Sequence, residues 1–547
     1  MHTLIDRTES AYGYPLLVKN LLFAPVADKP DQEIVYRGAL RFTYRQFMDR
    51  IRRLATALVK LGVERGDTVA VMDWDSHRYL ECFFAVPMIG AVLHTVNVRL
   101  SAEQLVYTIS HAEDTVIIVN SDFLPILDQI KGRIDTVKKL VLINESGASP
   151  AAPAVALDGE YEALLAAAAP MAEFPDLDEN TRATTFYSTG TTGMPKGVYF
   201  SHRQIVLHAL GTIATLGTAV TQGRFHREDV YMPLTPMFHV HAWGIPYVAT
   251  MLGVKQVYPG KYVPEVLLKL ITEEKVTFSH CVPTILNMLV SSPAAAAVDL
   301  SRWKVLIGGA ALPRSVAIAA LTRGVDVTVG YGMSESCPVL TLSQLDTEEM
   351  KLGIEEQADL RCRTGRPFAM VQLRVVDEQG GEVPRDDKAS GEVVVRAPWL
   401  TQGYLKDDTN SRKLWEGGWM HTLDIACRNA SGSIRITDRR KDIIKVGGEW
   451  LSSLELEDIL STHPAVAESA VVGQPDVTWG EVPLALVVLK NDQAATEKEL
   501  SAHVKNYADR GVLPREAFLV KIRFVDAIDK TSVGKINKVA LRAKYLG

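Results

Sequence analysis

Helical segments that alternate with short apolar runs are the feature that most limits what this chain can fold into. The first helix is predicted over 44–61, and a strand-like run over 68–74 follows a glycine turn. The apolar stripe of that helix consists of Phe47, Ile51, Leu54, Ala55 and Leu58. The alternation continues to a β-branched run at 115–120 and recurs over 264–307. Such crossover units predict an α/β fold with parallel sheets covered on both faces.

The pattern of predicted elements changes after residue 372. Short runs separated by tight turns, at 373–376, 391–396 and 433–437, indicate a small β-rich subdomain. Helix and strand patterns return from about residue 453 to the end. This organisation agrees with the roughly three or four domains or subdomains that 547 residues suggest.

Composition excludes several classes of protein. Apolar residues make up 47% of the sequence and charged residues 23%, which excludes collagen-like, low-complexity and wholly disordered chains. The formal net charge of −6 gives no electrostatic footprint for nucleic acid or anionic membranes, although it is compatible with a local basic pocket. The five cysteines are scattered and no pair has the spacing of a metal site, so we expect reduced thiols.

No segment of the sequence is predicted to direct the chain into or across a membrane. The N-terminus carries charges where a signal peptide needs an apolar core. The longest apolar stretches, such as 82–93, are too short to cross a bilayer. We therefore expect a cytoplasmic protein without an integral membrane segment.

The segment Thr185–Val198 gives the sharpest local indication of chemistry. A predicted strand leads into serine, threonine and glycine residues and then into Lys196. Gly190 and Gly193 let backbone N–H groups approach phosphate oxygens, and Lys196 adds a positive charge. The segment is typical of a phosphate-binding loop, but it is not a Walker A motif. A flexible surface loop is the alternative when the segment is considered alone.

Two other segments could contact a nucleotide. Gly330–Ser336 follows an apolar run, and ligands of α/β sheets bind beyond the carboxyl ends of the strands. Tyr331 could stack on a nucleobase there, and Glu335 could hold Mg²⁺ through oxygen. Asp424, in the β-rich region, could accept both hydroxyls of a ribose. An ordinary strand-to-helix turn explains Gly330–Ser336 equally well when it is taken alone, and a solvated turn residue is the favoured interpretation of Asp424 when it is taken alone.

The charged segment 436–450 joins a basic run to Gly447 and Gly448. It suits a hinge that faces phosphates, although charge runs are usually solvated surface. For the lysine-rich segment 529–538, the alternative interpretation is a flexible terminal tail. In the segment 233–246, histidines and a tryptophan cluster among apolar residues and prolines, which is typical of a pocket wall.

In this order, the six segments resemble the motifs of the adenylate-forming (ANL) superfamily, which includes acyl-CoA synthetases, nonribosomal adenylation domains and firefly luciferase. The resemblance runs from about Phe42 to Leu541. The stretches 236–244 and 530–535 look most like the medium- and long-chain fatty acyl-CoA synthetases. The resemblance implies an α/β N-terminal domain (1–440) of two α/β subdomains plus a small β-barrel. It also implies a small, mobile α+β C-terminal domain (441–547).

The resemblance implies a role for each matching residue. The phosphate loop would comprise Ser188, Thr189, Gly190, Thr191, Thr192 and Lys196. The nucleotide would also contact Gly308, Gly309, Ala310, Gly330, Tyr331, Gly332, Met333, Ser334, Asp424 and Arg439. The hinge and the segment after it would contribute Lys441, Lys445, Gly447 and Gly448. The acyl site would be formed by His239, Trp243 and Gly332, the metal ligands would be Thr191 and Glu335, and the catalytic residues Lys535, Glu335, Thr191 and His239.

The sequence departs from the family pattern at a few positions. The usual Thr-Gly-Asp is Thr422-Leu423-Asp424, which replaces a turn glycine by a residue that disfavours positive φ. Ser334 stands in place of the usual threonine, and Asp529 stands where proline is common. None of these changes removes a charged catalytic group.

The resemblance implies an ATP-dependent acyl-CoA synthetase that uses Mg²⁺. It would convert a carboxylic acid, ATP and CoA to acyl-CoA, AMP and pyrophosphate through an acyl-adenylate. We expect a medium-chain fatty or similar apolar acid. The alternatives are a short-chain or aromatic acid, physiological operation in reverse, an enzyme that loads a carrier protein, or a non-catalytic nucleotide or acyl sensor. Members of the family are often homodimers.

Overall fold

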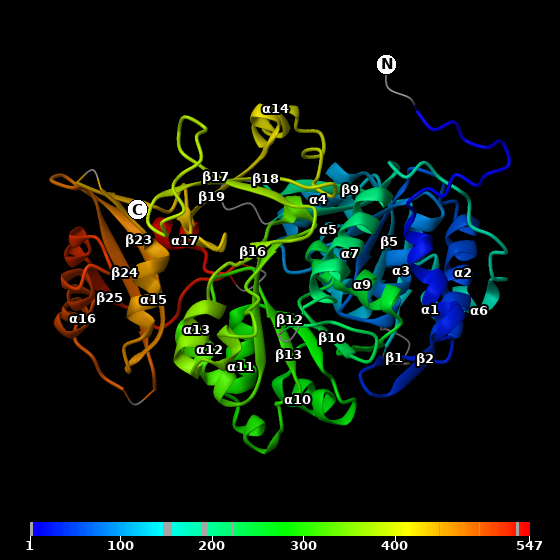
Figure 1. Ribbon diagram of the computed structural model, residues 1–547. Helices are drawn as coiled ribbons and strands as arrows, with labels where there is room; N and C mark the ends of the chain where they lie inside the picture. Colours follow the sequence, from blue (N-terminus) through cyan, green and yellow to red (C-terminus); the bar gives the residue numbers. More distant parts are fainter. Residues whose placement is uncertain are drawn as a thin grey trace.

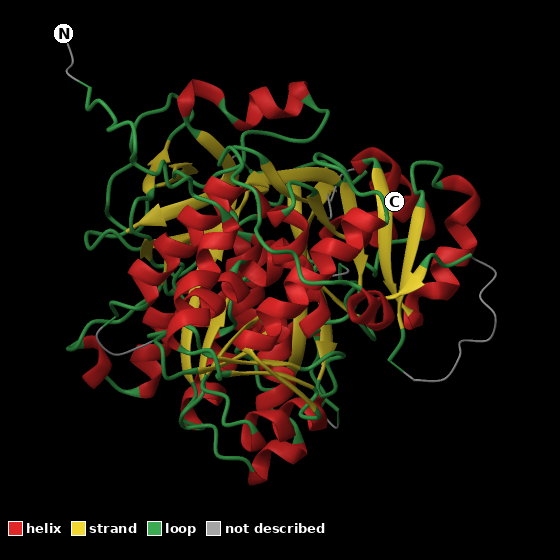
Figure 2. Ribbon diagram, turned by 90° about the vertical axis from the view of Figure 1, so that its right-hand side faces the viewer, coloured by secondary structure: helices red, strands yellow, loops and turns green. Residues whose placement is uncertain are grey.

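The computed structural model describes residues 4–145, 156–188, 194–219, 223–447, 449–491, 493–531 and 535–546. Two large sheets form the N-terminal part, a small antiparallel sheet caps them, and a separate sheet forms the C-terminal part (Figure 1). Figure 2 shows helices packed over the strands of the large sheets. The predicted α/β architecture, with a large N-terminal and a smaller C-terminal part, is confirmed.

The first large sheet has the strand order β7-β6-β5-β3-β4-β8-β9 within the described residues. All its neighbouring strands run parallel except β8 and β9. The strands are β3 (Thr68–Met72), β4 (Val92–Thr95), β5 (Asp114–Asn120), β6 (Lys139–Ile143), β7 (Gly159–Glu160), β8 (Arg182–Ser188) and β9 (Lys196–Ser201). Parallel strands with apolar side chains on both faces need helices on both sides, as the sequence predicted.

Helices that connect these strands, together with one before β3 and one after β9, cover the first sheet. They are α2 (Tyr44–Lys60), α3 (His77–Met88), α4 (Ala102–Ala112), α5 (Leu124–Ile130), α6 (Tyr161–Ala167) and α7 (His202–Leu216). The predicted apolar stripe of α2 is buried, and Thr43 and Gln46 form a capping box at its start. Ser201 and Gln204 form a second capping box at the start of α7.

The second large sheet has the order β16-β15-β14-β13-β12-β10-β11-β1-β2 within the described residues. Its strands are β1 (Glu33–Tyr36), β2 (Leu40–Thr43), β10 (Val230–Leu234), β11 (Lys255–Tyr258), β12 (Phe278–Cys281), β13 (Lys304–Ile307), β14 (Asp326–Gly332), β15 (Val339–Leu342) and β16 (Arg366–Pro367). Its accompanying helices are α1 (Phe23–Asp28), α8 (Val240–Trp243), α9 (Ile245–Leu252), α10 (Pro264–Glu273), α11 (Pro283–Val290), α12 (Arg314–Thr322) and α13 (Ile354–Arg361). The N-terminal hairpin β1–β2 therefore joins the second sheet, although the next helix packs on the first.

The β-rich region forms a four-stranded antiparallel sheet where the β-barrel was expected, with the order β17-β18-β19-β20. Its elements are β17 (Gln372–Val376), β18 (Ser390–Arg396), α14 (Asp408–Leu414), β19 (Met420–Arg428) and β20 (Ile434–Arg439). In Figure 1 this sheet lies above the two large sheets. It thus brings Asp424, on β19, towards the second large sheet.

The C-terminal part has its own sheet, in which β25 pairs with β24 beside the order β22-β21-β24-β23. Its elements are β21 (Ile444–Val446), β22 (Glu449–Leu451), α15 (Ser453–Ser461), β23 (Val466–Asp476), β24 (Gly480–Leu489), α16 (Glu497–Asp509), β25 (Lys521–Phe524) and α17 (Lys538–Tyr545). A hydrogen bond from the Arg314 backbone N–H to Asp458 Oδ1 at 3.5 Å joins it to α12. Figure 1 shows this part, in orange and red, beside α12 and α13.

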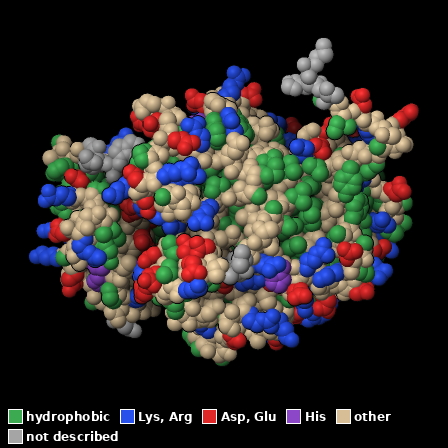
Figure 3. Space-filling model, viewed as in Figure 1, with side chains coloured by type: hydrophobic (Ala, Val, Ile, Leu, Met, Phe, Trp, Pro, Cys, Tyr) green, Lys and Arg blue, Asp and Glu red, His purple; other side chains and the backbone are tan. Residues whose placement is uncertain are grey.

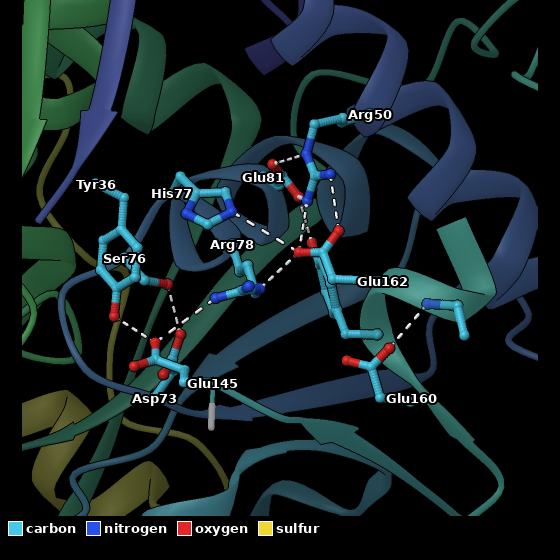
Figure 4. Close-up of polar contacts among 12 residues, drawn as sticks. Tyr36, Arg50, Asp73, Ser76, His77, Arg78, Glu81, Glu145, Glu160 and Glu162 are labelled. Carbon is cyan, nitrogen blue, oxygen red and sulfur yellow. Dashed lines mark hydrogen bonds and ion pairs between the residues drawn. The ribbon is translucent and has the colours of Figure 1, made fainter. Parts of the chain in front are cut away.

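A buried network of charged side chains holds α2, α3 and α6 together (Figure 4). Arg50 lies between two carboxylates, with Nε 2.6 Å from Glu81 Oε1 and Nη1 2.8 Å from Glu162 Oε2. Arg78 Nε also contacts Glu162, at 2.7 Å. The Tyr161 hydroxyl donates to the second Glu81 oxygen at 2.7 Å. Each charge in this network has a partner of opposite sign, so removal of one partner would leave a largely buried charge uncompensated.

The surface and the cysteines agree with the composition. Acidic and basic side chains are interspersed on the face shown in Figure 3. All five cysteines are free thiols. Among the described residues, no helix combines the length and apolar character that a membrane crossing requires.

Candidate active site

A pocket opens where the second large sheet meets the C-terminal part. The carboxyl ends of parallel strands β13 and β14 lie at its base, which is where ligands of α/β sheets bind. Its lining is His239, Val240, Trp243, Leu306, Gly308, Gly309, Gly330, Tyr331, Gly332, Met333, Ser334, Pro338, Val339 and Lys535. The pocket therefore combines residues from three of the six sequence segments with the glycines after β13.

The glycines after β13 let an aromatic ring approach the backbone. A Cβ atom on Gly308 would lie 3.1 Å from the Trp243 ring, and one on Gly309 would lie 3.3 Å from Lys535 Cε. Gly309 also has a φ of +81°, a conformation that favours glycine. Gly308 and Gly309 thus make room for both Trp243 and Lys535. Ala310, the next residue, is exposed and lies outside the pocket lining.

Tyr331, Asp424 and Arg439 form a connected polar group at the edge of the pocket. The Tyr331 hydroxyl donates to Asp424 Oδ2 at 2.7 Å, and Arg439 Nε lies 3.3 Å from Asp424 Oδ1. Burial raises the pKa of the Asp424 carboxyl, while the positive charge of Arg439 lowers it. The structure therefore brings together three residues that the sequence assigned to the nucleotide.

Leu423 retains the turn before Asp424 despite replacing the usual glycine. Its φ of 59° lies in the left-handed region, and 57% of its side chain is exposed. The Leu423 carbonyl accepts a hydrogen bond from the Arg440 N–H at 3.0 Å, and its own N–H donates to Glu392 Oε1 at 3.1 Å. These backbone contacts hold the strained conformation and keep Asp424 directed at Tyr331.

Glu335 is buried and has a partner that the sequence analysis missed. The Tyr404 hydroxyl donates to Glu335 Oε1 at 2.7 Å. The ammonium group of Lys196 lies 4.6 Å from the centroid of the same Tyr404 ring. Tyr404 follows Gly403 in the connection between β18 and β19, a position that periodicity does not mark. The structure thus joins the phosphate-loop lysine and the predicted metal ligand through one phenol.

The residues around Glu335 fit a magnesium ion that is held mainly by nucleotide phosphates. Among the described residues, no group of three or more His, Cys, Asp or Glu side chains is arranged to hold a metal. Mg²⁺ is commonly bound by one or two carboxylates together with substrate phosphates and water. The second oxygen of Glu335 accepts no hydrogen bond from the described residues, so this carboxylate fits that role.

Lys535, from the C-terminal part, enters the pocket from the opposite side to the large sheets. Desolvation and the nearby positive charge of Arg439 together lower the pKa of its ammonium group to about 8, although the negative charges of Asp424 and Glu335 oppose this shift. Within the part of the chain that the structure describes, Lys535 forms no ion pair. Its charge is therefore available to an anion in the pocket.

His239 is a neutral group at the wall of the pocket. Burial lowers the pKa of its imidazole to about 3, and the positive charge of Lys535 acts in the same direction. Trp243 stands close by, with its ring 5.1 Å from that of His280. The predicted wall of histidine and tryptophan is thus part of the pocket.

Several predicted site residues lie elsewhere or outside the described residues. Thr189, Gly190, Thr191, Thr192 and Gly448 fall outside the described ranges. Ser188 ends β8, and its hydroxyl is 3.5 Å from the Lys196 carbonyl oxygen. Lys441 is exposed between β20 and β21. Lys445 belongs to β21 of the C-terminal sheet, Gly447 lies in the turn after that strand, and both are absent from the pocket lining. A Cβ on Gly447 would lie 2.9 Å from the Trp479 ring.

Comparison with known proteins identifies the family. The family model of AMP-binding enzymes matches residues 22–405, and the model of the AMP-binding enzyme C-terminal domain matches residues 455–535. A long-chain-fatty-acid–CoA ligase of Thermus thermophilus is 41% identical over 92% of this chain and 90% of its own length. A medium-chain-fatty-acid–CoA ligase of Ectopseudomonas oleovorans is 37% identical over 91% of this chain and 89% of its own.

A solved structure has the same fold. The anthranilate CoA ligase AuaEII, in complex with anthranoyl-AMP, superposes with a TM-score of 0.84, covers 97% of this chain and 98% of its own, and is 24% identical. Together with the family models, the pocket and its polar groups, these matches show that the chain belongs to the AMP-binding enzyme family, as an acyl-CoA synthetase of the adenylate-forming superfamily.

Proposed function

We propose that the enzyme activates a medium-chain or similarly apolar carboxylic acid with ATP and transfers the acyl group to CoA. The observation that carries this proposal is the convergence of Lys535, His239 and Tyr331 on one pocket. Lys535 comes from the C-terminal part, His239 from the segment after β10, and Tyr331 from the end of β14. To join an apolar carboxylate to a nucleotide, an enzyme needs a lysine, an apolar wall and an aromatic contact for the nucleotide. The pocket contains all three.

The nucleotide would occupy the part of the pocket between the glycines after β13 and Tyr331. Tyr331 and Gly308–Ala310 would enclose the adenine. Asp424 would accept hydrogen bonds from the ribose hydroxyls, and the positive charge of Arg439 favours the ionised form of its carboxyl group against the effect of burial, which raises its pKa. The triphosphate would extend towards Lys196 and the phosphate loop 188–196. The Tyr331–Asp424 hydrogen bond supports this placement, because it fixes the carboxylate before the nucleotide arrives.

The first step joins two anions. An oxygen of the substrate carboxylate forms a bond to the α-phosphorus, and the bond between that phosphorus and pyrophosphate breaks. Little covalent assistance is needed, so positioning and neutralisation of charge supply the catalysis. Lys535 would offset the repulsion between carboxylate and α-phosphate. Mg²⁺, held by Glu335 and the phosphates, would neutralise the charge that develops on pyrophosphate.

The second step needs a different position of the C-terminal part. In the structure Lys535 lies in the pocket, whereas Gly447 packs against Trp479 outside it. This arrangement suits formation of the adenylate. Rotation at Lys441, with a domain boundary between 440 and 441, would remove Lys535 and bring 445–448 to the site. The CoA sulfur then attacks the acyl carbonyl, and AMP leaves with the carbonyl–phosphate oxygen.

The lining of the pocket supports an apolar acid. The lining includes the apolar side chains of Val240, Trp243, Leu306 and Val339, and its charged group is Lys535. Since the imidazole of His239 is neutral, it offers a hydrogen bond and no positive charge to a distal carboxylate. Dicarboxylic acids would leave one charge buried without a partner, which is strongly unfavourable.

A panel of straight-chain, branched, aromatic and dicarboxylic acids tests this specificity. The measurement is kcat/KM for each acid, followed as CoA-dependent release of AMP with saturating Mg·ATP. We expect the maximum among straight-chain acids of medium length. A maximum at acetate, at benzoate-like acids or at a dicarboxylic acid would contradict the proposed substrate class.

A further inference from the structure

The segment 235–243, called here the acyl-site segment, follows a strand of the second sheet but is held by the first. Three hydrogen bonds make this connection. The Met237 N–H donates to Asp75 Oδ1 at 2.8 Å, and the Thr95 hydroxyl donates to the Phe238 carbonyl at 3.0 Å. The third joins His241 Nε2 to Thr184 Oγ1 at 2.6 Å. The anchors come from β4, from β8 and from the turn after β3, and these strands are neighbours in the first sheet.

The acyl-site segment needs such anchors because its backbone is strained. Val240, His241, Ala242 and Trp243 have φ values of 48°, 53°, 48° and 58°, so four consecutive residues other than glycine are left-handed. Each such residue costs about 1–2 kcal/mol relative to the right-handed conformation. A strained turn persists only where surrounding contacts determine it. This turn directs His239 and Trp243 into the same pocket.

The geometry around His241 determines which ring nitrogen carries the proton. The Thr184 hydroxyl donates its single proton to the Leu93 carbonyl at 3.0 Å. The hydroxyl oxygen must therefore accept a hydrogen bond from His241 Nε2–H. The other nitrogen, Nδ1, has no hydrogen-bond partner among the described residues. Phe83 and Phe186 meet the His241 ring edge-on, with ring centroids 5.5 Å and 5.2 Å away.

We propose that His241, through its hydrogen bond to Thr184, is a positioning residue that sets His239 and Trp243 for the carboxylic acid substrate. Its single buried hydrogen bond lies in the middle of the strained turn and fixes the turn to β8. Asp75 and Thr95 hydrogen-bond to residues just before the turn, so they restrain only the start of the turn. The central residues of the turn are held by the hydrogen bond of His241. This inference rests on the proposed function, because the acid is the ligand whose site it shapes.

The test compares hydroxyl-removing and hydroxyl-keeping variants of Thr184. In Thr184→Val the side chain keeps its shape, but His241 Nε2–H loses its hydrogen-bond partner and the Leu93 carbonyl loses its contact with the hydroxyl. Thr184→Ser keeps the hydroxyl. Thr185→Val is the matched control, because Thr185 is the next residue of β8, is equally buried, and has a hydroxyl without a partner among the described residues. Acid-dependent ATP–pyrophosphate exchange gives KM for the acid and for ATP separately.

We expect Thr184→Val to raise KM for the acid tenfold to a hundredfold, which corresponds to loss of a buried hydrogen bond. KM for ATP should change less than about twofold, and Thr184→Ser should restore the acid KM. If Thr184→Val folds poorly, His241→Phe takes its place, because it keeps a ring in the aromatic surroundings. It should raise KM for the acid by a similar factor. Equal behaviour of Thr184→Val and Thr185→Val, or no rescue by serine, would overturn the proposal.

Crystal structures of the wild type and Thr184→Val test the role of Thr184 in holding the turn independently of the proposed function. The left-handed turn should be present in the wild type and rearranged in Thr184→Val, whatever acid the enzyme uses. If the wild type shows no exchange with any acid, the proposed function fails, and the two structures still decide whether Thr184 holds the turn. An unchanged turn in Thr184→Val would overturn the inference.

Discussion

The hydroxyl of Tyr404 donates a hydrogen bond to Oε1 of Glu335 at 2.7 Å. This bond fixes one oxygen of the carboxylate, while the Tyr404 ring lies against the Lys196 ammonium. A hydrogen bond to a charged group contributes about 1.5–3 kcal/mol, so we expect Tyr404→Phe to slow formation of the adenylate by about tenfold or more. The variant keeps the ring beside Lys196. Titration of the exchange rate with Mg²⁺ checks this, and an unchanged Mg²⁺ dependence and rate would contradict the role of the hydroxyl.

Removal of the Lys535 ammonium group should affect the two half-reactions unequally. We expect Lys535→Ala to reduce adenylate formation by on the order of 10²-fold or more, because the charge that offsets carboxylate–phosphate repulsion is lost. Thioester formation from a supplied acyl-adenylate should fall much less, since that step needs Lys535 to leave the pocket. Single-turnover assays of each half-reaction provide the measurement. Equal losses in both would contradict the assignment.

The lowered pKa of Lys535 predicts a basic limb in the pH profile. This pKa is about 8, mainly because of burial, so the ammonium form predominates below that pH and is lost as the pH rises through it. Since the cation is the active form, kcat/KM for adenylate formation should fall above about pH 8. Bound ATP adds negative charge and should move the limb of kcat to higher pH. A kcat/KM profile that is flat to pH 10, or that rises, would contradict this account.

Leu423 offers a test of backbone strain that leaves the site chemistry unchanged. Its left-handed φ is unfavourable for leucine, and its exposed side chain contributes little packing. We expect Leu423→Gly to stabilise the protein by about 0.5–1 kcal/mol, after allowance for the greater freedom of glycine in the unfolded chain. Leu423→Val, which is β-branched, should destabilise it. Urea denaturation distinguishes the two, and destabilisation by glycine would show that the turn is not strained.

The buried network of Figure 4 predicts a large loss of stability when one partner is removed. Replacement of Arg50 by methionine leaves Glu81, whose side chain is 1% exposed, facing an apolar group. Breaking a buried ion pair in this way costs about 3–5 kcal/mol. The exposed pair Arg133–Glu103 is the matched control, and Arg133→Met should cost less than about 1 kcal/mol. Similar denaturation midpoints for both variants would contradict the importance of the network.

Much of the fold follows from local patterns in the sequence. The helix α10 begins and the strand β13 ends at the bounds of the alternation predicted over 264–307, and the apolar stripe predicted for α2 is buried. These features depend on neighbouring residues, which a linear sequence displays. The pairing of β1 and β2 with the second sheet does not follow in this way, because it depends on contacts with β11 more than two hundred residues away.

Site residues that stand in a recognisable sequence segment were predictable. Contacts between residues that are far apart in the sequence, and that no local pattern marks, were not. Tyr331, Asp424 and Lys535 stand in segments that resemble family motifs, and the structure brings them to one region. Tyr404 was missed because its partner, Glu335, is 69 residues earlier and no local pattern marks the pair. The left-handed turn was missed because none of its four residues is glycine, so nothing in their composition indicates positive φ.

The most direct test of the central claim is ATP–pyrophosphate exchange over a panel of carboxylic acids, run with and without CoA. The account predicts exchange that requires an acid and occurs without CoA, together with stoichiometric AMP and acyl-CoA when CoA is added. Exchange without CoA-dependent turnover would indicate an enzyme that loads a carrier protein. Absence of exchange with every acid would contradict the assignment of this pocket to carboxylate activation.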